Sequence, residues 1–134
     1  MPDIGLTHIA LPVREIAASV EFYARYANMH IVHRRPGTVW ISDKTRPFAI
    51  VLLETSAEIS PLLPIAHLGI GISSKTEVDR LATIAREQGC LVAGPEESGP
   101  PIGYWAFLRD PDGHTLEIAY GQELGLTVER AAGP

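Results

Sequence analysis

The segment from residue 107 to residue 117 reads Phe-Leu-Arg-Asp-Pro-Asp-Gly-His-Thr-Leu-Glu, and it decides the fold of this 134-residue chain. Its centre, Asp110-Pro111-Asp112-Gly113, has the composition of a tight turn in which Gly113 is free to take a positive φ. The residues on both sides of the turn alternate as strands do. A tight turn fixes the register of the strand that follows it, so the segment predicts a strand that presents Glu117.

Three predicted strands each place one ionisable side chain on a face that is otherwise made of small residues. His8 shares its face with Ala10, His67 shares its face with Gly69 and Gly71, and Glu117 lies between Thr115 and Ala119. The opposite faces are branched and apolar, so they must pack against other elements, which we expect to be helices. The small faces leave an open space. Two imidazoles and one carboxylate that point into such a space indicate a divalent-metal site with free coordination positions.

The predicted elements recur in the same order in two halves, βαβββ twice, which indicates one α+β domain. Module one covers about residues 5–55, a Ser- and Pro-rich linker covers 56–64, module two covers about 65–121, and 122–134 is a C-terminal tail. In the first half we expect a strand at 5–13, a helix at 14–29, and strands at 30–35, 38–42 and 48–54. In the second half we expect a strand at 65–73, a helix at 75–88, and strands at 91–94, 103–109 and 115–120. Apolar spacing predicts that the two helices bury Ile16, Val20, Tyr23 and Ala27, and Val78, Leu81, Ala82 and Ala85.

The repeat also appears in the side chains. His8 and His67 occupy matching places in the first strand of each half, whereas the counterpart of Glu117 in the first half is Val51. Glu54 is acidic but falls on the opposite face from Val51, and only a bulge would turn it inward. The sequence therefore predicts three protein ligands. His30, His33 and His114 have no partner at matching positions, and we interpret them as surface or turn residues.

Bulk properties exclude several classes of function. The formal net charge of −5 at pH 7 argues against a nucleic-acid surface, and no apolar run approaches the roughly 20 residues that a membrane-spanning helix needs. The lone Cys90 excludes an internal disulfide and fits a reducing compartment. The first residues lack the basic-then-apolar pattern of a signal peptide. We therefore expect a cytoplasmic protein.

On these residues the chain resembles the vicinal oxygen chelate (VOC) superfamily, which includes glyoxalases, extradiol dioxygenases, fosfomycin-resistance enzymes and bleomycin-binding proteins. The resemblance extends to about Gly121, and it rests on the doubled βαβββ order, on 7–10 (Thr-His-Ile-Ala), on 66–69 (Ala-His-Leu-Gly) and on 107–117. It implies paired modules that form a curved, cleft-shaped mixed sheet with a metal on its floor. It implies His8, His67 and Glu117 as ligands of a divalent ion, which is Fe, Mn, Zn, Ni or Co.

The chain departs from each named activity of that superfamily. Val51 stands where glyoxalase I has an acidic ligand. Phe107 stands where extradiol dioxygenases have a Tyr, and residues 99–105 lack their His. The chain also lacks the basic and aromatic stretch that follows the ligands in fosfomycin-resistance transferases. Glyoxalase-like lyase or isomerase chemistry is the first hypothesis. An extradiol-type ring-cleaving dioxygenase and a non-catalytic drug or metabolite binding protein of the bleomycin-resistance type are the alternatives.

The substrate implied by the resemblance is a small molecule that chelates the metal through vicinal oxygens. Aromatic side chains are the candidate walls of its cleft, a basic one could meet an anionic group, and Glu54 is a candidate general base by reach alone. The candidate contacts are Trp40, Tyr104, Trp105, Phe107 and Arg109. Alternation puts Tyr104 on the opposite face from Trp105, Phe107 and Arg109, so only one set can face the cleft.

Oligomeric state follows from the resemblance alone. Short two-module chains of this superfamily usually form dimers, so we expect a homodimer. The metal site can then lie within one chain, or it can combine His8 of one subunit with His67 and Glu117 of the other.

Overall fold

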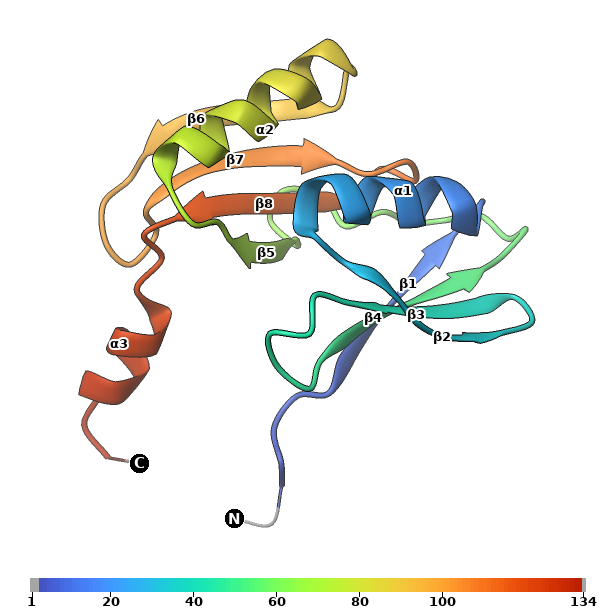
Figure 1. Ribbon diagram of the computed structural model, residues 1–134, viewed down its shortest axis with the longest axis horizontal. Coiled ribbons are helices and arrows are strands. Elements are labelled where there is room, and N and C mark those ends of the chain that lie inside the picture. The colour runs from blue at the N-terminus through green and yellow to red at the C-terminus, as the bar shows by residue number, and fades with distance from the viewer. Residues whose placement is uncertain (1–2, 134) are drawn as a thin grey trace. The chain divides into compact units, whose positions relative to one another are not determined.

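The structure is a computed structural model, and it describes residues 3–133. Helices and strands follow the order predicted for two βαβββ modules, and one more helix lies near the end of the chain (Figure 1). The elements are β1 (His8–Val13), α1 (Ile16–Ala27), β2 (His30–Arg35), β3 (Thr38–Ser42), β4 (Ala49–Glu54), β5 (Leu68–Gly71), α2 (Lys75–Glu87), β6 (Leu91–Glu97), β7 (Tyr104–Arg109), β8 (Thr115–Tyr120) and α3 (Leu124–Arg130). The chain divides into two compact units, one up to Pro61 and the other from Leu62. We call them unit 1 and unit 2.

Unit 1 is a four-stranded mixed sheet with α1 on one face. The strand order is β1-β4-β3-β2, in which β1 and β4 are parallel and the other pairs are antiparallel. The branched faces of the strands are buried on the side of α1, as the alternation predicts. Each buried aliphatic side chain contributes about 1.5–3 kcal/mol, so this face supplies most of the stability of the unit. Its core residues are Leu11, Val13, Val39, Ile41, Ile50 and Leu52.

Unit 2 repeats this plan. Its strand order is β5-β8-β7-β6, β5 and β8 are parallel, and α2 packs against β6, β7 and β8 (Figure 1). Ser74 caps α2, because its side chain accepts the Glu77 N–H at 3.1 Å. The helix buries the four predicted positions. The predicted α+β fold of two tandem βαβββ modules is confirmed.

The turn between β7 and β8 has the predicted chemistry. One carboxylate oxygen of Asp110 accepts the N–H groups of Asp112 and His114, each at 2.9 Å, and Gly113 has a φ of +92°. Asp110 is itself buried. This turn sets the antiparallel register in which Phe107 lies opposite Glu117. The most specific segment of the sequence thus places the candidate ligand on its strand.

The buried face of α1 differs in part from the predicted one, in which Tyr23 and Ala27 are correct. The helix buries Ser19, Phe22, Tyr23, Tyr26 and Ala27, while Ile16 and Val20 are only half-buried. Phe22 packs against both tyrosine rings, with centroids 5.0 Å from Tyr23 and 4.8 Å from Tyr26. Large rings bury more area than the two aliphatic side chains do, so the helix turns its aromatic side toward the sheet.

Two further differences concern histidines. β5 begins at Leu68, so His67 precedes its strand instead of lying within it. His114 is 1% exposed, which makes the surface interpretation wrong for this residue. Its Nδ1 accepts the Leu62 N–H at 3.0 Å, and Thr115 N–H donates to the Leu62 carbonyl at 2.8 Å. His114 therefore anchors the first residue of unit 2.

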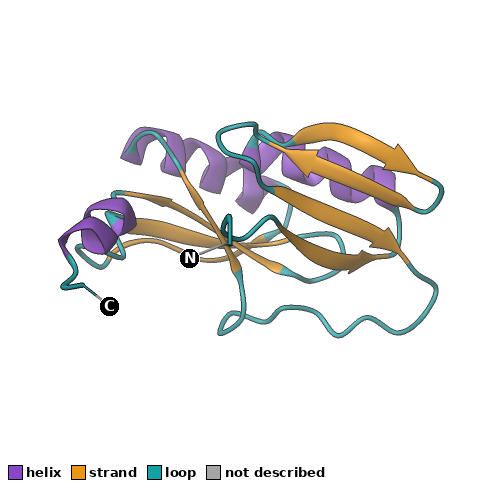
Figure 2. Ribbon diagram, turned by 90° about the horizontal axis from the view of Figure 1, so that it is seen from below, coloured by secondary structure: helices purple, strands orange, loops and turns teal. Residues whose placement is uncertain are grey.

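The remaining differences lie in the connections. The segment predicted as a C-terminal tail contains α3, which has no buried residue. The long loop between β4 and β5, teal in Figure 2, covers residues 55–67 and contains the predicted linker. In the described part of the chain, no helix has both the length and the apolar character that crossing a membrane requires.

Candidate functional site

Unit 2 brings two of the three predicted ligands together. Gly69 of β5 is the neighbour of Glu117 of β8 across the parallel strand pair, and His67 lies two residues before that glycine. This diagonal relation places His67 Nε2 3.6 Å from Glu117 Oε2. The side chain of Glu117 is 10% exposed, whereas that of His67 is 31% exposed. Within the pair, the carboxylate is therefore largely buried and the imidazole is the part nearer to solvent.

The hydrogen bond on the far side of the His67 ring fixes its tautomer. Nδ1 lies 2.8 Å from the Pro64 carbonyl oxygen, which can only accept, so Nδ1 carries the hydrogen. In the neutral ring, Nε2 then presents its lone pair to the Glu117 carboxylate. Two acceptors at 3.6 Å repel each other unless a proton or a cation lies between them. A histidine held in this way by a carbonyl is the usual arrangement for a metal ligand, so the pair fits a divalent ion.

A third side chain, Gln122, completes the surroundings of Glu117. Its amide nitrogen donates a short hydrogen bond to Glu117 Oε1 and leaves Oε2 facing the imidazole. Gln122 follows β8 directly after Gly121, whose φ is +82°. We did not predict this residue, because its contact depends on a reversal of the chain after the strand and not on strand alternation.

The space in front of the pair is open and has an aromatic wall. A Cβ added to Gly69 or Gly71 would meet no atom within 4 Å. Phe107 lies beside His67 with ring centroids 5.1 Å apart, and Trp105 lies beside Phe107 at 4.8 Å. The strand register puts both aromatic residues on the face of Glu117. Arg109 follows them on the same face, and it is exposed.

Tyr104 is not brought to this face. Its hydroxyl donates a short hydrogen bond to Asp79 of α2, and Lys75 Nζ lies 5.4 Å from the centre of its ring. The hydrogen bond to Asp79 raises the pKa of Tyr104 above its usual value. Tyr104 thus joins β7 to α2 on the helix side of the sheet, while Trp105 is on the other side.

Unit 1 carries the remaining predicted ligand. His8 is the first residue of β1 and is exposed, and its Nδ1 lies 2.9 Å from Thr7 Oγ1. Ala10 is paired with Val51 just as Gly69 is paired with Glu117, so Val51 is confirmed as the counterpart of the carboxylate. Unit 1 therefore offers one donor where unit 2 offers two.

Other predicted residues of unit 1 divide between the two faces of its sheet. Trp40 is paired with Val51 across β3 and β4, so it shares the face of His8, and its ring centroid lies 4.9 Å from that of His33. Glu54 falls on the side of Leu52, which is the helix side. The structure therefore does not bring Glu54 to His8.

The predicted ligands are divided between the units. Within residues 3–133, no group of three or more His, Cys, Asp or Glu side chains could hold a metal ion. The candidate metal ligands are therefore the His67–Glu117 pair in unit 2 and the exposed imidazole of His8 in unit 1.

A sequence profile of the Glyoxalase/Bleomycin resistance protein/Dioxygenase superfamily matches residues 5–118. The chain belongs to this superfamily. One relative is the uncharacterized protein PA2024 of Pseudomonas aeruginosa. It is 37% identical over 127 residues, which span 90% of this chain and 91% of the relative. The resemblance to the VOC superfamily is thereby confirmed over nearly the whole chain.

Solved structures of the superfamily share the fold. A possible glyoxalase from Bacillus cereus matches with a TM-score of 0.71 and 21% identity, covering 87% of this chain and 99% of that one. The fosfomycin resistance protein FosX from Listeria monocytogenes, as a variant complexed with Mn(II) and 1S,2S-dihydroxypropylphosphonic acid, gives 0.70 and 19%, covering 87% and 90%. TnmS3, an antibiotic binding protein from Streptomyces sp. CB03234, gives 0.67 and 20%, covering 90% and 98%. At these sequence identities the similarity establishes the fold alone, so the activity must be inferred from the residues of the site.

Proposed function

We propose that this chain is a metal-dependent enzyme that acts on a small molecule with two vicinal oxygens, by glyoxalase-like lyase or isomerase chemistry. The observation that carries the proposal is the His67–Glu117 pair, in which a lone pair fixed by the Pro64 carbonyl faces a buried carboxylate at 3.6 Å. A buried carboxylate costs several kcal/mol unless it is paired or bound to a cation. The pair is therefore poised for a divalent ion, and the open space over Gly69 leaves room for substrate.

In this proposal His67 Nε2, Glu117 and His8 hold the ion, which is Fe, Mn, Zn, Ni or Co. When bound, the ion supplies Lewis-acid stabilisation of negative charge that develops on the substrate oxygens. Gln122 holds one oxygen of Glu117 and so orients the other. The complex of FosX with Mn(II) supports a divalent ion in this fold.

The aromatic wall formed by Trp105 and Phe107 is the surface on which we expect the substrate to pack. Phe107 lies beside the imidazole and Trp105 lies beside Phe107, so a flat or apolar part of the substrate packs on these two rings while its oxygens turn toward the pair. Arg109 lies farther along the same face and would meet an anionic group. Trp40 offers a second aromatic surface on the same sheet face as His8 in unit 1.

The same wall favours one alternative, a metal-free binding protein of the bleomycin-resistance type, and TnmS3 is an antibiotic binding protein with this fold. Metal content separates the two functions. The enzyme proposal expects about one divalent ion per chain after purification without chelator or after titration with Mn(II), and His67→Ala removes it. The exposed His30 is the matched control, and His30→Ala should keep the ion. A binding protein would instead hold substoichiometric metal and would keep its ligand affinity after His67→Ala.

The alternative activity, extradiol-type ring cleavage, can be tested directly. Phe107 occupies the position of the Tyr that those enzymes carry, so iron-loaded protein is expected to leave catechols intact under oxygen. Consumption of oxygen with ring cleavage would replace the lyase or isomerase proposal with this activity.

The proposal includes a homodimer in the cytoplasm, and a single half-buried cysteine, Cys90, is consistent with a reducing compartment. We propose that His8 of one subunit completes the site of the other. A mixed dimer of His8→Ala and Glu117→Ala subunits then contains one intact site, since the unmodified His8 meets the unmodified pair. It should bind one Mn(II) per dimer, as seen by titration of the purified heterodimer. If each site lay within one chain, the mixed dimer would bind none, and sharing between subunits would be disproved.

A further inference from the structure

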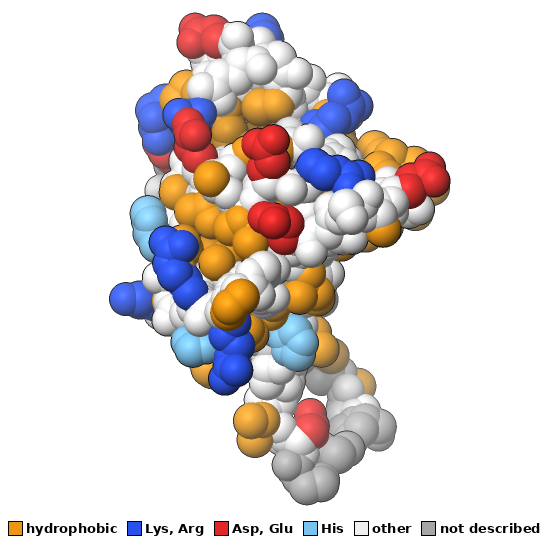
Figure 3. Space-filling model, turned by 90° about the vertical axis from the view of Figure 1, so that its right-hand side faces the viewer, with side chains coloured by type: hydrophobic (Ala, Val, Ile, Leu, Met, Phe, Trp, Pro, Cys, Tyr) orange, Lys and Arg blue, Asp and Glu red, His pale blue; other side chains and the backbone are white. Residues whose placement is uncertain are grey.

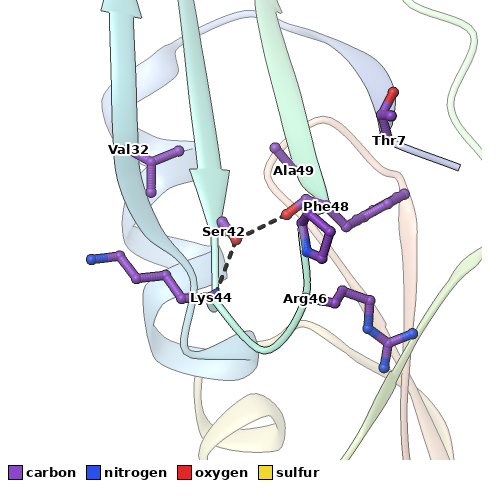
Figure 4. Close-up of a pocket in the computed structure, with 8 residues that line it drawn as sticks. Thr7, Val32, Ser42, Lys44, Arg46, Phe48 and Ala49 are labelled. Carbon is purple, nitrogen blue, oxygen red and sulfur yellow. Dashed lines mark hydrogen bonds between the residues drawn. The ribbon is translucent and has the colours of Figure 1, made fainter. Parts of the chain in front are cut away.

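A pocket of about 550 Å³ opens at the end of the sheet of unit 1, beside the loop between β3 and β4. Two cationic side chains from this loop, Lys44 and Arg46, line it together with hydroxyl and apolar groups (Figure 4). We propose that this pocket binds the carboxylate or phosphate group of a small organic anion. The pocket residues are Thr7, Val32, Ser42, Lys44, Arg46, Pro47, Phe48 and Ala49.

The loop backbone that carries Lys44 and Arg46 is held by its own hydrogen bonds. Ser42 is 7% exposed, and its hydroxyl donates to the Phe48 carbonyl at 2.8 Å and accepts the Lys44 N–H at 3.0 Å (Figure 4). One oxygen of Asp43, the acid of the loop, is occupied by the N–H and hydroxyl of Thr45 at 3.0 and 2.7 Å. Neither Lys44 nor Arg46 forms an ion pair with another described residue. Their charges are available to a ligand.

The net negative charge of the chain does not lie in the unit that carries the pocket. Residues 1–61 contain six Lys and Arg and six Asp and Glu, so unit 1 is formally neutral, and the net charge of −5 arises in residues 62–134. The strand positions on the face of His8 carry no acidic side chain. They are His8, Ala10, Pro12, His30, His33, Arg35, Thr38, Trp40, Ser42, Ala49, Val51 and Leu53. On the surface drawn in Figure 3, Lys and Arg side chains lie next to His and hydrophobic ones in the lower part of the view.

The lining also decides what kind of anion fits. Val32, Pro47 and Phe48 supply an apolar surface, which suits an organic group. In Figure 4, Arg46 extends to the side on which Thr7 lies, and Lys44 extends to the side of Val32. Arg46 is therefore the cation that we assign to the anionic group, because a guanidinium pairs bidentately with carboxylate and phosphate.

The pocket adjoins the candidate ligand of unit 1. Thr7 lines it and is also the hydrogen-bond neighbour of His8 Nδ1, while Ala49 lines it and is the strand neighbour of His8. The pocket therefore borders His8 through these two residues. Resting on the proposed function, this position assigns the substrate class: vicinal oxygens at one end, and a carboxylate or phosphate at the other.

Binding can be measured on the metal-free, full-length, ¹⁵N-labelled protein with benzoate, benzamide and inorganic phosphate as probes. Benzoate and phosphate should give saturable shifts of the backbone amides of Lys44, Thr45, Arg46, Phe48 and Ala49, and benzamide should give none. Arg46→Gln should weaken benzoate binding at least about tenfold, since a hydrogen bond to a charged group is worth about that factor or more. Arg25→Gln is the matched control, because it removes the same charge from an exposed position on α1, and it should change binding less than about twofold.

Equal binding of benzamide, or unchanged benzoate affinity in Arg46→Gln, would overturn the pocket as an anion site. Shifts confined to other parts of the chain would do the same. The experiment contains no metal, so its outcome is separate from that of the enzyme proposal. Benzoate binding in a protein that binds no Mn(II) would leave this pocket standing and remove the proposed function.

Discussion

Glu117→Gln is expected to lower the affinity of the protein for Mn(II) at least about 100-fold. The substitution keeps the shape of the side chain and removes the negative charge that faces His67 Nε2 at 3.6 Å. Loss of an outer partner of a ligand typically costs 10–100-fold in metal affinity, and loss of a ligand itself costs more. Titration of the chelator-treated protein with Mn(II) by calorimetry measures the change.

Two variants make that titration specific. Glu87→Gln removes an equal charge from an exposed position of α2 and should leave the affinity unchanged. Gln122→Ala removes the hydrogen bond to Glu117 Oε1 but no ligand, so it should give an intermediate loss of about tenfold. Mn(II) affinity that stays the same in Glu117→Gln would show that the ion binds elsewhere, and the His67–Glu117 pair would lose its proposed role.

The parts of the fold that were predicted correctly are those set by local chemistry. The Asp110–Gly113 turn needs only its own carboxylate and a glycine with positive φ, so the register that puts Phe107 opposite Glu117 follows from sequence. The same alternation separates Tyr104 from Trp105. Because the two halves have the same order of elements, His8 and His67 occupy equivalent positions, two residues before Ala10 and Gly69.

The features that were missed depend on contacts between distant segments. The sequence places His114 beside a turn, but in the structure its ring is buried and accepts the Leu62 N–H. This hydrogen bond joins residues that are 52 positions apart in the chain. Gln122 reaches Glu117 only because the chain reverses after β8. The aromatic side of α1 was missed because spacing alone gives several possible faces, and the choice depends on the volume offered by the sheet. The third ligand of the metal site likewise depends on a contact between distant segments, so the role of His8 as a ligand remains a proposal.

Gly103→Ala is expected to destabilise the protein by about 3 kcal/mol or more, because no relaxation of a side chain can relieve the contact. Gly103 has a φ of +84°, and a Cβ there would lie 2.3 Å from the Tyr120 carbonyl oxygen and 2.9 Å from the Gly121 carbonyl carbon. The left-handed conformation costs an alanine about 1–2 kcal/mol, and displacing packed backbone adds about 1–3 kcal/mol. Unfolding by urea, followed by far-UV circular dichroism, measures the loss.

Gly99 provides the matched control, because it lies in the same connection between β6 and β7. Its φ is +70°, but a Cβ there would meet no atom within 4 Å, so Gly99→Ala should cost only the conformational part, about 1–2 kcal/mol. The difference between the two variants isolates the close approach of Gly103 to the end of β8. Because that approach fixes the backbone at Gly121, just before Gln122, Gly103→Ala should also weaken Mn(II) binding, whereas Gly99→Ala should not. Equal stability losses in the two variants would mean that β8 can shift freely, and the strand end would then not be what orients the carboxylate.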